Sequence, residues 1–98
     1  MTLPVVYRRA ASAEFSDAVA YYEEQRPHLG VEFVEEVEHC IGHVAGDPLR
    51  FPIVHTDIRR VAIRRFPYSL YYRVEARRIV VLSVFHGRRN PNAWKGRE

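Results

Sequence analysis

The stretch RRFPYSLYYRVEARRIVVLSVFHGRRNPNAW, Arg64 to Trp94, contains two runs of aromatic and β-branched residues, with an arginine pair before the first and another after the second. The runs Tyr68–Glu75 and Ile79–His86 have the composition of strands, and the short segment between them is typical of a tight antiparallel connection. The second run is apolar on both faces, with residues 79, 81 and 85 expected on one side and 80, 82 and 84 on the other. Such a strand belongs in the interior of a sheet.

A third strand is predicted just before this stretch, over Ile58–Arg65. Side chains alternate along a strand, so Val61 and Ile63 point one way while Arg60 and Arg64 point the other. If the apolar pair packs against helices, the two arginines stand together on the open face of the sheet.

The first half of the chain predicts a short strand, Val5–Arg8, followed by two helices. The first helix is expected to begin at Ser12 as N-cap and to end before Pro27, and the second runs from Leu29 to Gly46 with an apolar stripe. The order β-α-α-β-β-β predicts an α+β fold in which a helical hairpin covers one face of a mainly antiparallel sheet.

Length and composition favour one domain over residues 1–98. A chain of 98 residues, of which 47% are hydrophobic, supports a single core. Cys40 is the only cysteine, which excludes an intramolecular disulfide and favours the reducing cytoplasm. No run approaches the ~20 apolar residues of a membrane-spanning helix, and we expect neither export nor membrane insertion.

Charge divides the chain into two halves of opposite sign. Residues 1–56 carry a net charge of −5, whereas residues 57–98 carry +8. Four arginines beside the most apolar segment add planar groups that bind phosphate or carboxylate with two parallel hydrogen bonds. This asymmetry predicts a basic surface directed at an anionic partner, either nucleic acid or an acidic protein segment.

The motifs FPYSLYYRV and HGRR, joined by an apolar strand, resemble the RelE/ParE superfamily of toxins from bacterial type II toxin–antitoxin modules, which include plasmid stabilisation proteins. The resemblance covers nearly the whole chain. It implies a toxin that arrests growth and a cognate antitoxin that wraps a partly disordered segment over it. RelE-like members cut mRNA on the translating ribosome, whereas ParE-like members inhibit DNA gyrase.

The residues that match RelE-like enzymes are incomplete. The arginine before the turn corresponds to Arg64, or to Arg65 with a shift of one position, and the arginine after the last strand corresponds to Arg89. The C-terminal tyrosine has no counterpart, and Ser69 stands where RelE-like sequences often carry another arginine. The resemblance therefore favours ParE-like gyrase inhibition, with the ribosome-dependent endoribonuclease and a non-toxic antitoxin-binding module as alternatives.

For the ribonuclease alternative, the candidate catalytic residues are His86, Arg64 and Arg89, because histidine can exchange a proton near neutral pH and arginine can stabilise phosphorane charge. Tyr71 shares a strand face with Arg73 and is expected to be exposed and able to stack on a partner. The predicted target-binding residues are Arg60, Arg64, Arg65, Tyr71, Arg88, Arg89, Trp94 and Lys95.

A metal site is not expected. His39 and His43 are separated by one helical turn, but Cys40 beside them belongs to the apolar stripe of the helix and no second Cys/His cluster follows. No cofactor is predicted. The expected partners are the antitoxin and either gyrase or the ribosome with its mRNA.

Overall fold

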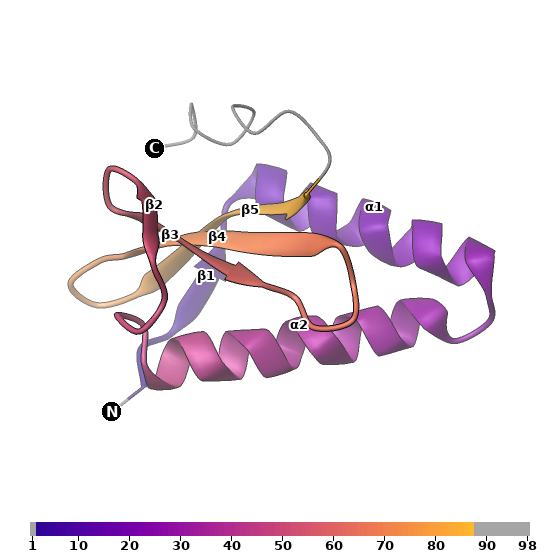
Figure 1. Ribbon diagram of the computed structural model, residues 1–98, viewed down its shortest axis with the longest axis horizontal. Helices are drawn as coiled ribbons and strands as arrows, with labels where there is room; N and C mark the ends of the chain where they lie inside the picture. Colours follow the sequence, from indigo (N-terminus) through magenta and orange to yellow (C-terminus); the bar gives the residue numbers. More distant parts are fainter. Residues whose placement is uncertain (1, 88–98) are drawn as a thin grey trace.

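Two helices and five strands make up the part of the chain that the computed structural model describes, residues 2–87. Figure 1 shows the helices as a hairpin packed against one sheet, which confirms the predicted α+β fold. The elements are β1 (Val5–Tyr7), α1 (Arg9–Gln25), α2 (Leu29–Gly46), β2 (Ile53–His55), β3 (Ile58–Ala62), β4 (Tyr68–Val74) and β5 (Ile79–His86).

The sheet has the strand order β1-β5-β4-β3-β2. Strand β1 pairs with β5 in parallel, and the other three pairings are antiparallel. The predicted bounds of β5 and its interior position between β1 and β4 are both confirmed. Strand β2 was not predicted, because a run of three residues is too short to show the alternation that marks a strand.

Four element ends differ from the prediction. Helix α1 begins at Arg9 and not after Ser12, because Arg8 is extended and its carbonyl already accepts a hydrogen bond from the Ser12 N–H at 3.0 Å. Strand β3 ends at Ala62 and not at Arg65, since the chain turns immediately afterwards toward β4. Strands β1 and β4 each end one residue earlier than predicted.

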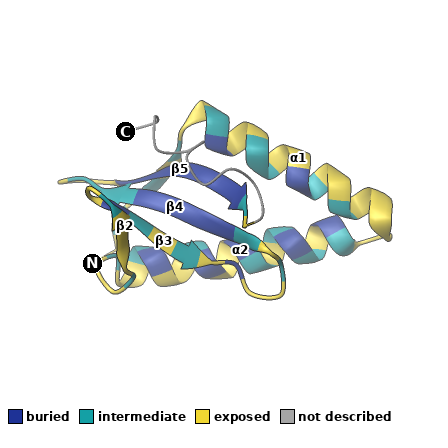
Figure 2. Ribbon diagram, turned by 45° about the horizontal axis from the view of Figure 1, so that its top comes forward, coloured by how far each residue is buried: buried dark blue, intermediate teal, exposed yellow. Residues whose placement is uncertain are grey.

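The main core lies between the helices and one face of the sheet. Figure 2 shows buried positions along the inner sides of both helices and through β4 and β5. Helix α2 contributes the predicted stripe, and α1 contributes two small residues that allow close packing. The buried residues of this cluster are Ala11, Ala18, Phe33, Val37, Cys40, Val44, Ile63, Leu70, Tyr72, Ile79, Val81 and Val84.

A β-bulge interrupts the pairing of β4 with β5. Tyr71 pairs with Ser83, whereas the next residue, Tyr72, pairs with Val81. Leu82 is therefore the extra residue of β5 at this register shift. An extra residue shifts the alternation of side chains by one position in the remainder of the strand.

The bulge corrects the predicted faces of β5. Val84 packs in the main core together with Ile79, and Phe85 lies in a second cluster on the other face. Glu14 of α1 holds the bulge, because its Oε1 accepts hydrogen bonds from the Ser83 hydroxyl at 2.9 Å and the Val84 N–H at 3.2 Å. The sequence pattern assumed unbroken alternation and assigned these two side chains to the wrong faces.

The turn between the helices depends on Glu23 and Gly30. The carboxylate of Glu23 accepts hydrogen bonds from the N–H groups of His28 and Gly30, at 3.0 and 3.1 Å, and satisfies two backbone donors at the start of α2. A Cβ at Gly30 would lie 2.8 Å from the carbonyl oxygen of Val19 in α1. The two helix backbones therefore approach too closely at this point for a side chain.

We predict that Gly30→Ala lowers the free energy of unfolding by about 1–3 kcal/mol, the usual effect of overpacking. Gly42→Ala is the matched control, because Gly42 lies in the same helix and a Cβ there would meet nothing within 4 Å. That substitution should raise stability by up to about 1 kcal/mol through helix propensity. Urea denaturation of both variants measures the difference, and equal stabilisation by both would contradict the close helix contact.

Candidate functional site

The face of the sheet that points away from the helices is built around a second apolar cluster. Alternation along β3, β4 and β5 brings large side chains together there, and all of them are buried. The cluster consists of Ile58, Tyr71, Val80, Leu82 and Phe85. We call this surface the open face, because neither α1 nor α2 packs on it.

Polar and charged residues flank the cluster on the open face. The Nε of Arg60 donates a hydrogen bond to the hydroxyl of the buried Ser69 at 3.0 Å, which fixes the side chain of an exposed arginine. Arg73 forms an ion pair with Asp57 at 3.0 Å. Within residues 2–87, Ser69 is the hydrogen-bond partner of Arg60, so the two terminal nitrogens of the guanidinium remain for a ligand.

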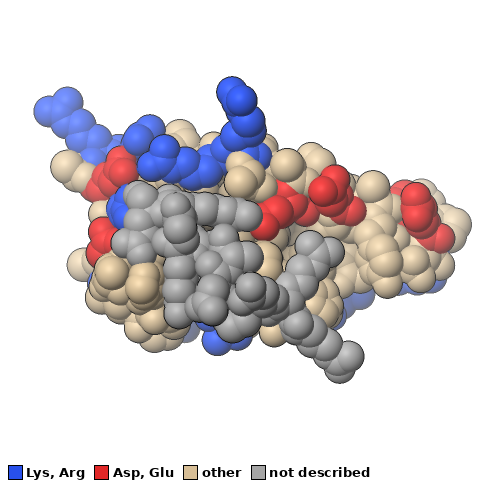
Figure 3. Space-filling model, turned by 90° about the horizontal axis from the view of Figure 1, so that it is seen from above, with Lys and Arg blue, Asp and Glu red and all other residues tan. Residues whose placement is uncertain are grey.

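Basic side chains gather mainly at the end of the molecule opposite the turn between α1 and α2, which we call the strand end. Figure 3 shows the largest groups of Arg there, with some acidic side chains among them, and further Asp and Glu in a row toward the turn between the helices. This arrangement matches the opposite net charges of the two halves of the sequence. An anionic partner is therefore attracted to the strand end.

Arg64 does not join Arg60 on the open face, which corrects the prediction from strand alternation, and Arg65 lies beside α2 as well. The strand ends at Ala62, so alternation no longer determines where the following side chains point. Arg64 lines a cavity beside α2. Arg65 has a left-handed backbone conformation and forms ion pairs with two glutamates of α2.

The ion pairs of Arg65 form a small charged network on the surface. Its guanidinium lies 2.7 Å from Glu32 and 3.5 Å from Glu36, and Arg26 lies 3.0 Å from Glu32. Hydrogen bonds from Arg65 and Arg26 lower the pKa of Glu32, and the bond to Glu32 raises the pKa of Arg65. This network connects the β3–β4 turn to both sides of the turn between the helices, at Arg26 after α1 and Glu32 in α2.

Tyr71 is not the exposed aromatic residue that the sequence predicted. Its exposed fraction is 8%, and its ring belongs to the buried cluster that also contains Ile58 and Phe85. In this conformation Tyr71 cannot stack on a nucleic-acid base. The exposed tyrosine among residues 2–87 is instead Tyr21 on α1, with an exposed fraction of 56%.

His86 lies on the helix side of the sheet, opposite Arg60. Its partner in β4 is Tyr68, and their rings meet edge to face with centroids 5.2 Å apart. Together with Asp17 and Tyr22 they border a cavity beside α1 of about 550 Å³. The bulge in β5 explains this position, since unbroken alternation would have placed His86 on the open face.

The candidate catalytic residues are therefore not gathered in one site within the described part of the chain. His86 and Arg64 line two cavities that share no residue. Arg88, Arg89, Trp94 and Lys95, which the sequence also singled out, lie outside the described residues.

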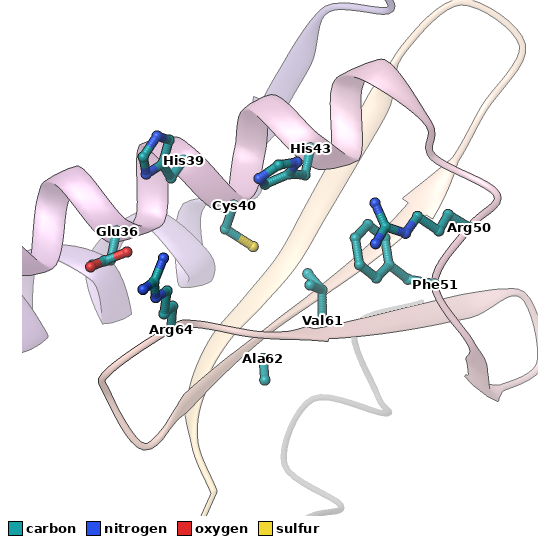
Figure 4. Close-up of a pocket in the computed structure, with 9 residues that line it drawn as sticks. All are labelled: Glu36, His39, Cys40, His43, Arg50, Phe51, Val61, Ala62 and Arg64. Carbon is teal, nitrogen blue, oxygen red and sulfur yellow. The ribbon is translucent and has the colours of Figure 1, made fainter.

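The cavity beside α2, which we call the edge cavity, was not predicted. It has a volume of about 290 Å³ and lies between the second half of α2 and β3 (Figure 4). The pair His39 and His43 showed in the sequence that this side of α2 is polar, but only the fold shows that it faces a strand. The edge cavity is lined by Glu36, His39, Cys40, His43, Arg50, Phe51, Val61, Ala62 and Arg64.

The thiol of Cys40 lies on the inner side of the edge cavity and is protonated. Burial raises its pKa to about 11, so the thiol stays protonated at neutral pH and is neither a nucleophile nor a thiolate ligand. Across residues 2–87, no group of three or more His, Cys, Asp and Glu side chains is arranged to hold a metal ion. The edge cavity has a partly apolar wall with guanidinium and imidazole groups around it.

None of the described helices is long and apolar enough to cross a membrane.

Comparison with known proteins identifies the family. Residues 5–91 match the family model of the ParE toxin of the type II toxin–antitoxin system parDE. No curated protein sequence matches the chain.

Two solved structures share the fold. The chromosomal ParDE toxin–antitoxin system from P. aeruginosa matches with a TM-score of 0.76 and 17% identity, over 87% of this chain and 96% of the other. The toxin–antitoxin complex RelBE2 from Mycobacterium tuberculosis matches with a TM-score of 0.60 and 22% identity, over 88% and 92%. Because the family model covers most of its length, the chain belongs to the ParE toxin family of type II toxin–antitoxin systems.

Proposed function

We propose that this chain is a toxin that inhibits DNA gyrase in the bacterial cytoplasm when its antitoxin is absent. The observation that carries the proposal is the match of residues 5–91 to the ParE toxin family. The antitoxin is its second partner, and ParDE and RelBE2, two of the solved structures with this fold, are toxin–antitoxin assemblies.

The separation of Arg60 from His86 supports binding over RNA cleavage. Cleavage of RNA through its own 2′-hydroxyl requires a group that accepts a proton, cations that stabilise the phosphorane and an acid for the leaving oxygen. Arg60 supplies only the cation, because a guanidinium stays protonated. His86, the candidate proton carrier, lies on the other side of the sheet and lines the cavity beside α1.

We propose that Arg60 contacts the target together with Arg88 and Arg89, which the sequence assigns to the same role. Ser69 holds the Arg60 guanidinium in one orientation, which reduces the entropy lost when a carboxylate or phosphate binds. Arg65 has a different role in this proposal, since Glu32 and Glu36 already bind it and it stabilises the turn.

Expression of the chain without antitoxin should arrest growth, induce the DNA damage response and produce filamentous cells. The expected cause is stalled gyrase on DNA, and co-expression of the antitoxin should prevent all three effects. Reporter mRNAs on translating ribosomes are followed in parallel. Rapid cutting of these mRNAs without DNA damage would favour the ribonuclease, and unimpaired growth at verified expression would favour a non-toxic binding module.

Arg60→Ala should weaken growth arrest, so that about tenfold more protein is needed, because one charge-assisted contact contributes roughly 1.5–3 kcal/mol. Arg26→Ala is the control: it removes the same charge from the turn between the helices, where Arg26, itself exposed, forms an ion pair with Glu32. Titrated induction with immunoblotting measures the difference. Equal toxicity of the two variants would remove Arg60 from the target contact.

A further inference from the structure

The cavity beside α1 takes no part in the proposed contact of Arg60 with the target. It has a volume of about 550 Å³ and lies between the second half of α1 and the region where β4 begins and β5 ends. We call it the aromatic cavity. It is lined by Asp17, Tyr21, Tyr22, Pro67, Tyr68 and His86.

Four aromatic rings follow one another around the aromatic cavity, each turned steeply against the next. The ring centroids of Tyr21 and Tyr22 lie 5.3 Å apart, with an angle of 74° between the ring planes. The corresponding values are 6.0 Å and 67° for Tyr22 and Tyr68, and 5.2 Å and 81° for Tyr68 and His86. Because neighbouring rings differ so much in orientation, they border the cavity from several sides and do not form a parallel stack.

The aromatic cavity also contains one carboxylate. Asp17 lies one helical turn before Tyr21 on α1, so the two side chains are neighbours on the helix surface. Within residues 2–87 no hydrogen bond or ion pair engages Asp17, and no arginine or lysine of these residues lines the cavity. In this part of the chain the charge of Asp17 therefore remains available to a ligand.

The surroundings of the cavity are acidic as well. Glu14 and Glu24 lie on the same face of α1 as Asp17, because they precede and follow it at helical spacing. The cavity adjoins the half of α1 that leads to the turn between the helices, and Figure 3 shows a row of acidic side chains toward that turn. A cation is therefore attracted to this region, whereas an anion is repelled.

Aromatic walls and a carboxylate together are suited to an organic cation. The face of an aromatic ring carries partial negative charge and attracts an ammonium or guanidinium group within about 6 Å of the ring centroid. Tyrosine rings also offer apolar surface to the methylene groups that carry such a cation. The carboxylate of Asp17 adds an ion pair.

We propose that the aromatic cavity binds an organic cation, which is the guanidinium or ammonium group of a partner protein's side chain or of a free polyamine. Asp17 forms the ion pair, and the rings of Tyr21, Tyr22 and Tyr68 contact the cation. Tyr21, with an exposed fraction of 56%, borders the opening of the cavity and becomes covered by the ligand. This inference is independent of the proposed gyrase inhibition, because it uses none of the predicted target-binding residues.

Titration of the purified chain with N-acetylarginine amide, followed by NMR, tests the binding of a cation directly. The side-chain signals of Tyr21 and His86 should shift and saturate with a dissociation constant on the order of 1–10 mM, as expected for one ion pair with cation–π contacts. N-acetylcitrulline amide is the matched control ligand, because it has nearly the same shape and no charge. It should bind at least about tenfold more weakly.

Variants of the chain assign the binding to these residues. Asp17→Asn should weaken binding of the arginine ligand about three- to fivefold through loss of the ion pair, and Tyr21→Ala about two- to fivefold through loss of a ring face. Tyr21→Phe keeps the ring and should stay within about twofold. Glu35→Gln is the control, because Glu35 is exposed on α2 and does not line the cavity. Urea denaturation confirms that each variant is folded.

Spermidine as a third ligand distinguishes the two sources of the cation. Binding at least about tenfold tighter than that of the arginine ligand would assign the cavity to a free polyamine, since several linked ammonium groups would engage the acidic face of α1 together. Weaker or similar binding would assign it to a side chain of a partner protein. Three results would overturn the proposal: no saturable shift with any ligand, equal affinities for the arginine and citrulline ligands, or an unchanged affinity in Asp17→Asn.

Discussion

The bulge in β5, held by Glu14, determines which residues share a face of the sheet. One carboxylate oxygen of Glu14 accepts hydrogen bonds from Ser83 and from the backbone of Val84, where the extra residue Leu82 disturbs the ladder with β4. A buried backbone N–H without a partner costs about 1–3 kcal/mol, so this contact stabilises the bulge and fastens α1 to the sheet. From this point to its end, β5 presents each side chain to the face opposite the one that unbroken alternation would give.

This change of face places Arg60 and His86 on opposite faces of the sheet. Arg60 and Ser69 remain on the open face beside an apolar cluster, while His86 packs against Tyr68 on the helix side. A surface with a fixed guanidinium and a buried apolar centre is suited to binding an anionic group on a macromolecule. His86, the histidine that the sequence singled out as a proton carrier, therefore lies on the opposite face of the sheet from Arg60.

The sequence predicted the bounds of the elements that have a strong apolar pattern. It did not predict the side-chain positions that depend on tertiary contacts. Strand β5 and helix α2 have their predicted bounds, because apolar residues on both faces or along one stripe leave one arrangement that buries them. The bulge has no signature in the sequence, and the faces of residues 84–86 could not be predicted without the contact from Glu14. Arg64 was misplaced for a different reason, since β3 ends two residues before it.

The most direct test of the separation between Arg60 and His86 is supercoiling of relaxed plasmid by purified gyrase in the presence of the purified chain. The wild-type protein should inhibit supercoiling, His86→Ala should inhibit it equally, and Arg60→Ala should require about tenfold more protein, the loss expected for one charge-assisted contact. Full supercoiling with the wild-type chain, together with cleavage of ribosome-bound mRNA that is lost in His86→Ala, would contradict this account.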